Sequence, residues 1–196
     1  PWSSSGRGVL KVSADNNDVM QPRVERIIKR QRGIAVEPFY NRVMDFALEF
    51  HVGKHGVAYN GISVFATSST GAYTGNYVSD EPCLKRRIPE ALQGYLSDVR
   101  KNLQRHLQNV YSQGYSGPLG VDMMVVEHKG EKYIHPCVEV NLRQTMGNVC
   151  VSLRSQLRRG AAIYRLRPVG DTTEATLVLT PCAKRIEAVL QTEEAE

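Results

Sequence analysis

The sequence predicts an α+β fold, and three patterns carry that prediction. Two pairs of predicted strands are separated by short glycine-containing turns, which is typical of antiparallel hairpins, and the first strand, residues 43–52, alternates apolar and polar residues. These pairs are residues 43–52 with 57–67, and residues 120–127 with 132–140. Longer segments with helical apolar spacing lie between them, and no internal repeat is visible. A doubly wound parallel sheet would instead alternate single strands with helices, so antiparallel α+β is favoured.

Each segment is assigned from its own pattern. Helices are predicted where apolar residues recur every three or four positions, at residues 19–32, 89–114 and 145–159. Further strands are predicted at residues 9–12, 34–38, 161–167 and 175–179. Residues 68–82 are rich in Ser, Thr, Gly, Asn and Tyr and are predicted to form a long loop. Residues 191–196 are predicted to be a frayed acidic tail.

Composition indicates an ordinary globular protein. The chain has 196 residues, of which 41% are hydrophobic and 23% charged. No stretch approaches the roughly 18 apolar residues of a membrane helix, and no signal segment opens the chain. We therefore expect a cytoplasmic protein with no membrane partner. The four cysteines form no C-x-x-C pair, so free thiols are expected.

The net charge of +5 leaves three interpretations open: a solvated basic surface, a pocket for a polyanion such as a triphosphate, or a nucleic-acid site. Basic residues are spread from Arg7 to Arg185. Aromatic residues make up 7% of the chain and do not interleave with a basic run as a base-stacking surface requires. Nucleic acid is therefore not the expected partner.

A turn of small residues near the start of the chain could bind phosphate. It consists of Ser3, Ser4, Ser5 and Gly6, followed by Arg7 and Gly8. Such a turn can present backbone N–H groups and hydroxyls to phosphate oxygens. It is not a P-loop, because no Gly-Lys-Ser/Thr follows. A plain surface turn has the same composition.

A second candidate site lies at the end of an apolar strand. Alternation places Glu139 and Asn141 on the same side of the chain, and Asp122 can lie beside them if the two strands pair as a hairpin. Two carboxylates and an amide oxygen form the hard oxygen site that Mg²⁺ prefers. Arg143 follows closely and could contact a phosphoryl group. Asp122 alone would be interpreted as a salt-bridged or capping group.

A third candidate is the hydrophobic segment that contains Val36, Glu37, Pro38 and Phe39. Such a segment can form the wall of an adenine pocket, with backbone groups contacting the base edge. Asp45 lies further along, where a carboxylate could accept hydrogen bonds from ribose hydroxyls. Glu37 is equally well explained as a strand-end charge.

Taken in order, these motifs resemble the ATP-grasp superfamily. The resemblance covers roughly residues 1–160, and E-V-N-L-R at residues 139–143 is its most specific part, with G-V-D before it and T-M-G after it. It implies that two α+β subdomains clamp ATP. The Ser/Gly loop would close over the phosphates, residues 36–39 would line the adenine hinge, and Asp45 would contact ribose.

The resemblance also implies a metal site and a reaction. Asp122, Glu139 and Asn141 would bind Mg²⁺, with Mn²⁺ as an alternative, and Arg143 would contact phosphate or an acylphosphate. The enzyme would be an ADP-forming ligase that joins a small carboxylate to an amine or, less often, a thiol. No catalytic His or Cys is needed, and Cys137 is interpreted as a core residue.

The resemblance also divides the chain. Residues 1–82 are expected to form one subdomain, residues 83–180 the second, and residues 181–196 a C-terminal helix or tail. The family's phosphate-binding Lys and N-terminal domain would lie upstream of Pro1, so this chain alone could be inactive. Two alternatives therefore stay open: a non-catalytic nucleotide-binding module and a basic RNA-binding domain. The sequence predicts neither the substrates nor the oligomeric state.

Overall fold

The computed structural model describes residues 10–68, 73–111, 114–157, 161–169 and 172–180. Seven strands follow one another in the order β1 (Asn41–Gly53), β2 (Gly56–Thr67), β3 (Tyr73–Val78), β4 (Gly117–His128), β5 (Glu131–Asn141), β6 (Ala161–Val169) and β7 (Thr172–Thr180). The helices are α1 (Asn17–Gln31), α2 (Glu81–Lys85), α3 (Glu90–Gln93), α4 (Leu96–Tyr111) and α5 (Met146–Leu153), with short 3-10 turns at Ala14–Asn16 and Arg154–Gln156.

The strands form a seven-stranded sheet in the order β5-β4-β1-β2-β3-β6-β7. Every pairing among the described strands is antiparallel. The predicted α+β class and both predicted hairpins, β1 with β2 and β4 with β5, are therefore confirmed. Within the described residues, no helix has the length and apolar character needed to cross a bilayer.

One face of the sheet is the hydrophobic core. Phe46, Leu48 and Phe50 alternate along β1 toward this face and are almost completely buried. Leu96 and Leu107 of α4 pack against them. Burial of each such side chain contributes roughly 2 kcal/mol of stability. A one-residue slip would turn these side chains to the other face and lose that stability, so their burial fixes the register of the central strands.

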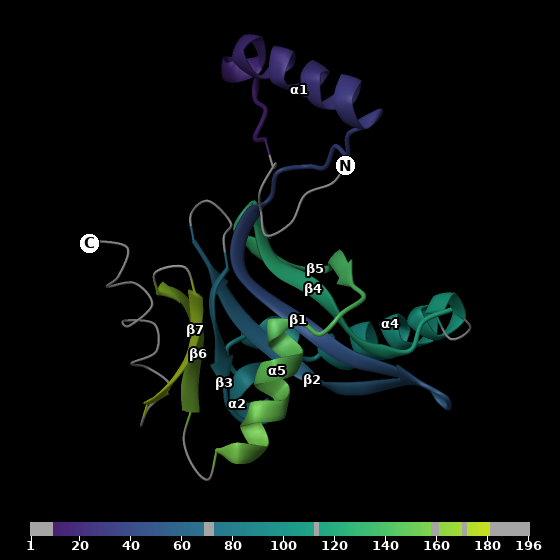
Figure 1. Ribbon diagram of the computed structural model, residues 1–196, viewed down its shortest axis with the longest axis vertical. Helices are drawn as coiled ribbons and strands as arrows, with labels where there is room; N and C mark the ends of the chain where they lie inside the picture. The colour runs from purple at the N-terminus through teal and green to yellow at the C-terminus, as the bar shows by residue number, and fades with distance from the viewer. Residues whose placement is uncertain (1–9, 69–72, 112–113, 158–160, 170–171, 181–196) are drawn as a thin grey trace.

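The opposite face of the sheet is polar, and helix α5 lies across it (Figure 1). Asp45, Ala47 and Glu49 alternate with the core residues and therefore point to this face. Gly147 of α5 approaches Glu49 so closely that a Cβ atom there would overlap the carboxylate. The two faces are thus covered by different helices.

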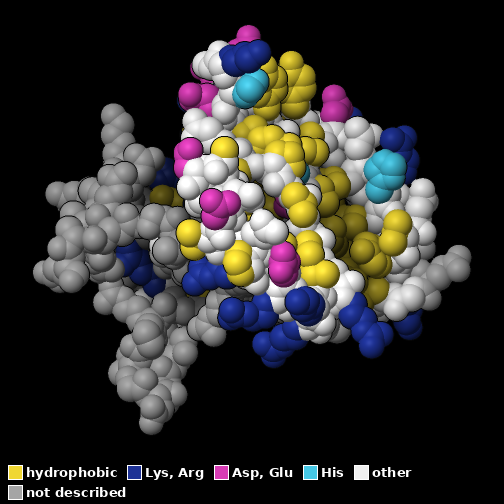
Figure 2. Space-filling view, turned by 90° about the horizontal axis from the view of Figure 1, so that it is seen from above, with side chains coloured by type: hydrophobic (Ala, Val, Ile, Leu, Met, Phe, Trp, Pro, Cys, Tyr) yellow, Lys and Arg dark blue, Asp and Glu magenta, His cyan; other side chains and the backbone are white. Residues whose placement is uncertain are grey.

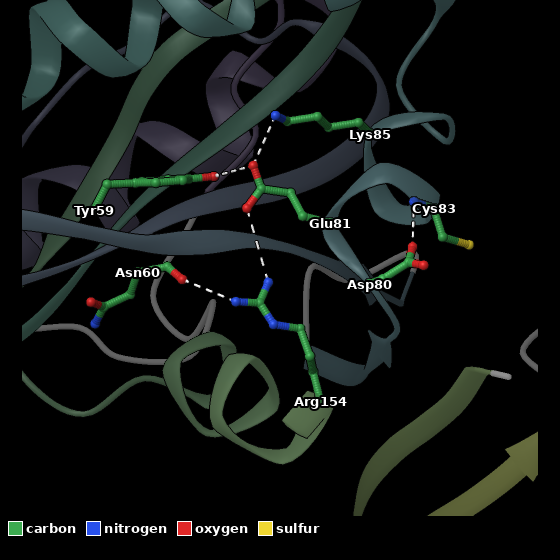
Figure 3. Close-up of polar contacts among 7 residues, drawn as sticks. All are labelled: Tyr59, Asn60, Asp80, Glu81, Cys83, Lys85 and Arg154. Carbon is green, nitrogen blue, oxygen red and sulfur yellow. Dashed lines mark hydrogen bonds and ion pairs between the residues drawn. The ribbon is translucent and has the colours of Figure 1, made fainter. Parts of the chain in front are cut away.

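A charged cluster ties α2 to strand β2 and to the end of α5 (Figure 3). Glu81 accepts a hydrogen bond from the Tyr59 hydroxyl at 3.2 Å and lies 2.8 Å from the Lys85 ammonium. The Arg154 guanidinium lies 3.9 Å from the same carboxylate and donates to the backbone oxygen of Asn60 at 3.4 Å. The cluster joins elements on either side of the sheet near its middle strands.

Several predicted elements were wrong. Residues 34–38 form no strand, and residues 10–12 form none either. The predicted loop at residues 68–82 contains β3, whose loop-like composition has a packing reason. Gly75 leaves room for the backbone oxygen of Tyr164 on β6, and buried Asn76 donates to Val64 O at 3.4 Å. The helix predicted at residues 89–114 is divided into α3 and α4.

The described cysteines, Cys83, Cys137 and Cys150, are free, as expected, and Cys182 lies outside the described residues. Cys137 is exposed rather than in the core. It lies on β5, an edge strand that has one neighbour in the sheet, β4, so its side chains are less covered than those of the central strands.

Helix α1 lies beside one end of the sheet rather than on either face (Figure 1). None of its residues is buried, although its last turn ends normally, with Arg32 in the left-handed conformation (φ 60°). Seen from this end, hydrophobic side chains occupy the middle of the surface, and Lys and Arg side chains lie mainly along one edge (Figure 2).

The predicted boundary between residues 82 and 83 falls inside α2. Strands from both sides of it belong to the same sheet. The division into two subdomains around a nucleotide stays a prediction, and the predicted tail at residues 181–196 lies outside the described residues.

Candidate functional site

The register of β5, β4 and β1 brings the predicted metal ligands together on the polar face. One row across the sheet pairs Glu139 on β5 with Asp122 on β4, and Asp122 in turn with Ala47 on β1. The next row pairs Asn141 with Gly120. Because paired residues on neighbouring strands share a face, as do residues two apart on one strand, Asp122, Glu139 and Asn141 point to one side.

Hydrogen bonds link these side chains. The Asn141 amide nitrogen donates to the Asp122 carboxylate at 3.0 Å. The Arg143 guanidinium donates to the Asn141 amide oxygen at 2.9 Å. Asn141 is therefore held in one orientation between an anion and a cation. Arg143 lies just beyond the end of β5, where its side chain is exposed.

Burial, followed by the neighbouring charge of Glu139, raises the pKa of Asp122 to about 6. The hydrogen bond from Asn141 and the charge of Arg143 oppose this shift without cancelling it. Burial and the neighbouring carboxylate thus destabilise the charged form of Asp122, and a bound cation would stabilise it.

Asp45 lies one row further along the polar face. Its carboxylate accepts a hydrogen bond from the Thr67 hydroxyl at 2.7 Å and lies 3.1 Å from the Arg42 guanidinium. Burial raises its pKa despite these two partners. Its charge also contributes to the raised pKa of Asp122, so the two carboxylates belong to one electrostatic environment.

Glu49 is a further carboxylate on the same face, and it is 1% exposed. Ser63 donates to one of its oxygens at 2.9 Å. Thr145 and Asn148, at the start of α5, donate to the other at 2.9 Å and 2.6 Å. Burial raises the pKa of Glu49 to about 7, although the Thr145 and Ser63 hydrogen bonds lower it.

This shift predicts a pH-dependent stability. The folded chain keeps the Glu49 proton up to about pH 7, whereas the unfolded chain releases it near the ordinary value of 4.5, so stability falls as pH rises between them. Glu49→Gln should remove this contribution. Relative to the variant, the wild type should lose on the order of 2 kcal/mol of unfolding free energy between about pH 5 and about pH 7.

Urea denaturation of both proteins at several pH values would measure this difference. A difference in unfolding free energy that stays constant over this range would contradict a raised pKa for Glu49.

The donor set suits a hard divalent cation. Asp122 and Glu139 supply carboxylate oxygens, and Asn141 supplies an amide oxygen. Among the described residues, no group of three or more His, Cys, Asp or Glu is arranged to hold a metal, so the amide is needed to complete this set. Arg143 would have to release the Asn141 oxygen for that oxygen to bind a cation.

Two further groups of residues were predicted to belong to the nucleotide site. Ser3, Ser4, Ser5 and Gly6 lie outside the described residues. The predicted hinge, which contains Val36, Glu37, Pro38 and Phe39, is exposed and directly precedes β1. The Lys11 ammonium lies 4.0 Å from the centre of the Phe39 ring. No hydrogen bond or ion pair found in the described parts of the chain connects residues 36–39 with Asp122 or Glu139.

A groove of about 960 Å³ opens beside the start of β1. Its walls include Arg42, Arg86, Arg87 and Lys132, so it is rich in positive charge. Asp45 lines it, whereas Asp122 and Glu139 do not. The groove is therefore adjacent to the candidate metal site but separate from it.

The sequence did not identify Glu49 or its partners. Glu49 follows the alternation of an ordinary strand, and its role depends on which residues lie opposite. Those residues are Gly61 on β2 and Gly120 on β4. Only the register shows that glycines flank Glu49 on both strands, and Gly120 leaves room for its carboxylate.

A seven-stranded antiparallel sheet, with α4 on one face and α5 on the other, makes this an α+β fold. The chain shares this fold with solved structures of an L-amino acid ligase and a carboxyaminoimidazole synthetase. No family model matches the chain, and no curated protein matches it.

Three similar structures show how far the likeness extends. An L-amino acid ligase from Bacillus licheniformis aligns with a TM-score of 0.57 and 13% identity, over 96% of this chain and 61% of its own. Pyruvate carboxylase from Rhizobium etli aligns with a TM-score of 0.54 and 14% identity, over 84% of this chain and 16% of its own. N5-carboxyaminoimidazole synthetase from Staphylococcus aureus, complexed with ADP, aligns with a TM-score of 0.51 and 9% identity. The alignment covers 81% of this chain and 52% of the synthetase. This chain spans less than two thirds of each.

Proposed function

We propose that this chain is the nucleotide-binding part of an ATP-dependent ligase that activates a carboxylate as an acylphosphate. The observation that carries the proposal is the pairing of Asp122 with Glu139 beside Asn141 and Arg143 on the polar face. The ATP-grasp fold supports it, and one of the similar structures is named as an L-amino acid ligase.

In this proposal, Asp122, Glu139 and Asn141 hold Mg²⁺ or Mn²⁺ through their oxygens. The cation, when bound, would neutralise charge on the phosphate oxygens. Asp122 and Glu139 then lose the mutual repulsion that raises the Asp122 pKa. Arg143 releases Asn141 and contacts the transferred phosphoryl group, for which its planar guanidinium is suited.

The remaining predicted residues complete the nucleotide site. Ser3, Ser4, Ser5 and Gly6 would cover the phosphates through backbone N–H groups and hydroxyls. Val36, Glu37, Pro38 and Phe39 would line the adenine pocket. Asp45, which already accepts a hydrogen bond from Thr67, would accept another from a ribose hydroxyl.

The reaction has two steps. A substrate carboxylate oxygen bonds to the γ-phosphorus of ATP, and the bond to ADP breaks, which gives an acylphosphate. An amine nitrogen, or a thiol, then bonds to the acyl carbon, and phosphate leaves. The carboxylate is already a nucleophile, so the first step depends on positioning and charge neutralisation rather than on a general base. The substrates are small molecules, and the enzyme is cytoplasmic with two subdomains closing on ATP.

The experiment that tests this function is a calorimetric titration of ATP into the chain. We expect binding in the presence of Mg²⁺, loss of that binding when EDTA is added, and no competition from single-stranded RNA of equal phosphate concentration. Binding that survives EDTA and is displaced by RNA at low salt would instead identify a basic nucleic-acid surface. ADP release on addition of carboxylates would separate a ligase from a non-catalytic nucleotide-binding module.

A further inference from the structure

The buried carboxylate of Glu49 connects β1 to the segment that carries Asn141 and Arg143. That segment, residues 141–145, runs from the end of β5 to the start of α5. Its last residue, Thr145, donates to Glu49 at 2.9 Å. Asn148, in the first turn of α5, donates to the same oxygen at 2.6 Å.

The same groups begin helix α5. The Thr145 hydroxyl accepts a hydrogen bond from the Asn148 backbone N–H at 2.9 Å, which is an N-cap. The Asn148 side chain also donates to Leu119 O on β4 at 3.3 Å. Glu49 therefore accepts hydrogen bonds from both side chains that start the helix.

Two glycines leave the room that the Glu49 carboxylate occupies. A Cβ atom on Gly120 would lie 2.7 Å from a Glu49 oxygen, and one on Gly147 would overlap the other. Gly120 is the residue paired with Asn141 in the sheet. Glu49 thus fills the space between the strand pair that holds Asn141 and the helix that follows Arg143.

We infer that Glu49 is a positioning residue of the nucleotide site: it fixes the loop of residues 141–145 so that Asn141 and Arg143 face the metal and the phosphates. This inference rests on the proposed function. Glu49 touches neither ligand. It acts through Thr145 and Asn148, and the chain between Thr145 and Asn141 is short enough to pass on any displacement.

Glu49→Gln tests this inference, because the amide keeps the size of the side chain but turns one acceptor into a donor that faces Thr145 and Asn148. The readout is the factor by which Mg²⁺ strengthens ATP binding in calorimetry. We expect this factor to fall by about tenfold to a hundredfold, as for other residues that orient metal ligands. A purely structural defect would weaken ATP binding equally with and without Mg²⁺.

A second pair of variants tests the same hydrogen bond from Thr145, its donor. Thr145→Val should reduce the Mg²⁺ factor, and Thr145→Ser, which keeps the hydroxyl, should restore it. The control is Ser152→Ala, which removes a hydrogen bond of 3.0 Å to Asn148 O without touching Glu49. Hydrogen exchange provides an independent readout: the amides of Asn148 and Val149 should exchange faster in Glu49→Gln than in Ser152→Ala.

The outcomes separate the two claims. If the wild type shows Mg²⁺-dependent ATP binding and Glu49→Gln keeps both the Mg²⁺ factor and slow exchange at Asn148, the positioning role is overturned and the proposed function stands. If the wild type shows no Mg²⁺-dependent binding, the proposed function is overturned and this inference with it.

Discussion

Glu139→Ala is expected to weaken Mg-ATP binding by on the order of a hundredfold, the largest effect of any single substitution on binding. Glu139 and Asp122 are the two carboxylates paired across β4 and β5. Removing one leaves a divalent cation with a single carboxylate and one amide oxygen. Calorimetry of ATP with and without Mg²⁺ measures the loss, which should be confined to the Mg²⁺-dependent part.

The matched control is Glu131→Ala. Glu131 lies on the same strand, is exposed, and contributes the same charge at the other end of β5. The two variants therefore change the net charge equally. Equal losses of affinity in both would attribute binding to the overall charge of the surface and would contradict a metal site at Glu139.

Gly147→Ala is expected to lower the free energy of unfolding by about 2–3 kcal/mol. A glycine-to-alanine change inside a helix ordinarily stabilises it by up to about 1 kcal/mol. Here the added methyl group would overlap both the Glu49 carboxylate and the Ser63 hydroxyl. Glu49 cannot move aside without losing the hydrogen bonds from Thr145 and Asn148, so overpacking outweighs helix propensity.

Gly94→Ala provides the comparison. Gly94 follows α3, has a φ of −60°, and has no atom within 4 Å of the position of an added Cβ. Its substitution should change stability by less than about 1 kcal/mol. Urea denaturation of the wild type and the two variants would measure both changes in the free energy of unfolding. A neutral Gly147→Ala would mean that α5 lies further from Glu49 than the structure places it.

The sequence predicted the central part of the candidate site because that part depends on local patterns. Two apolar segments, residues 120–127 and 132–140, flank a short turn and predicted a hairpin, and the hairpin aligns Asp122 with Glu139. The turn between the two strands is short, and a short turn allows few registers of strand pairing. Side chains that must share a face within one hairpin can therefore be identified from sequence.

Contacts between distant segments could not be predicted in this way. Glu49 meets Thr145 and Asn148 across most of the chain, and nothing in the alternation of β1 indicates which helix covers it. Strand β3 was missed for a related reason. Asn76 and Gly75 are poor strand formers, and they are accommodated only because β2 and β6 lie on either side.

The central claim is that Asp122, Glu139 and Asn141 hold the cation of a bound metal–ATP complex, and Mn²⁺ can locate that cation directly. Bound Mn²⁺ broadens the NMR signals of nearby nuclei steeply with proximity. On addition of substoichiometric Mn-ATP, the backbone amides of Asp122, Glu139 and Asn141 should broaden first. Broadening centred instead on the basic groove at Arg86 and Arg87, with these three amides unaffected, would contradict the claim.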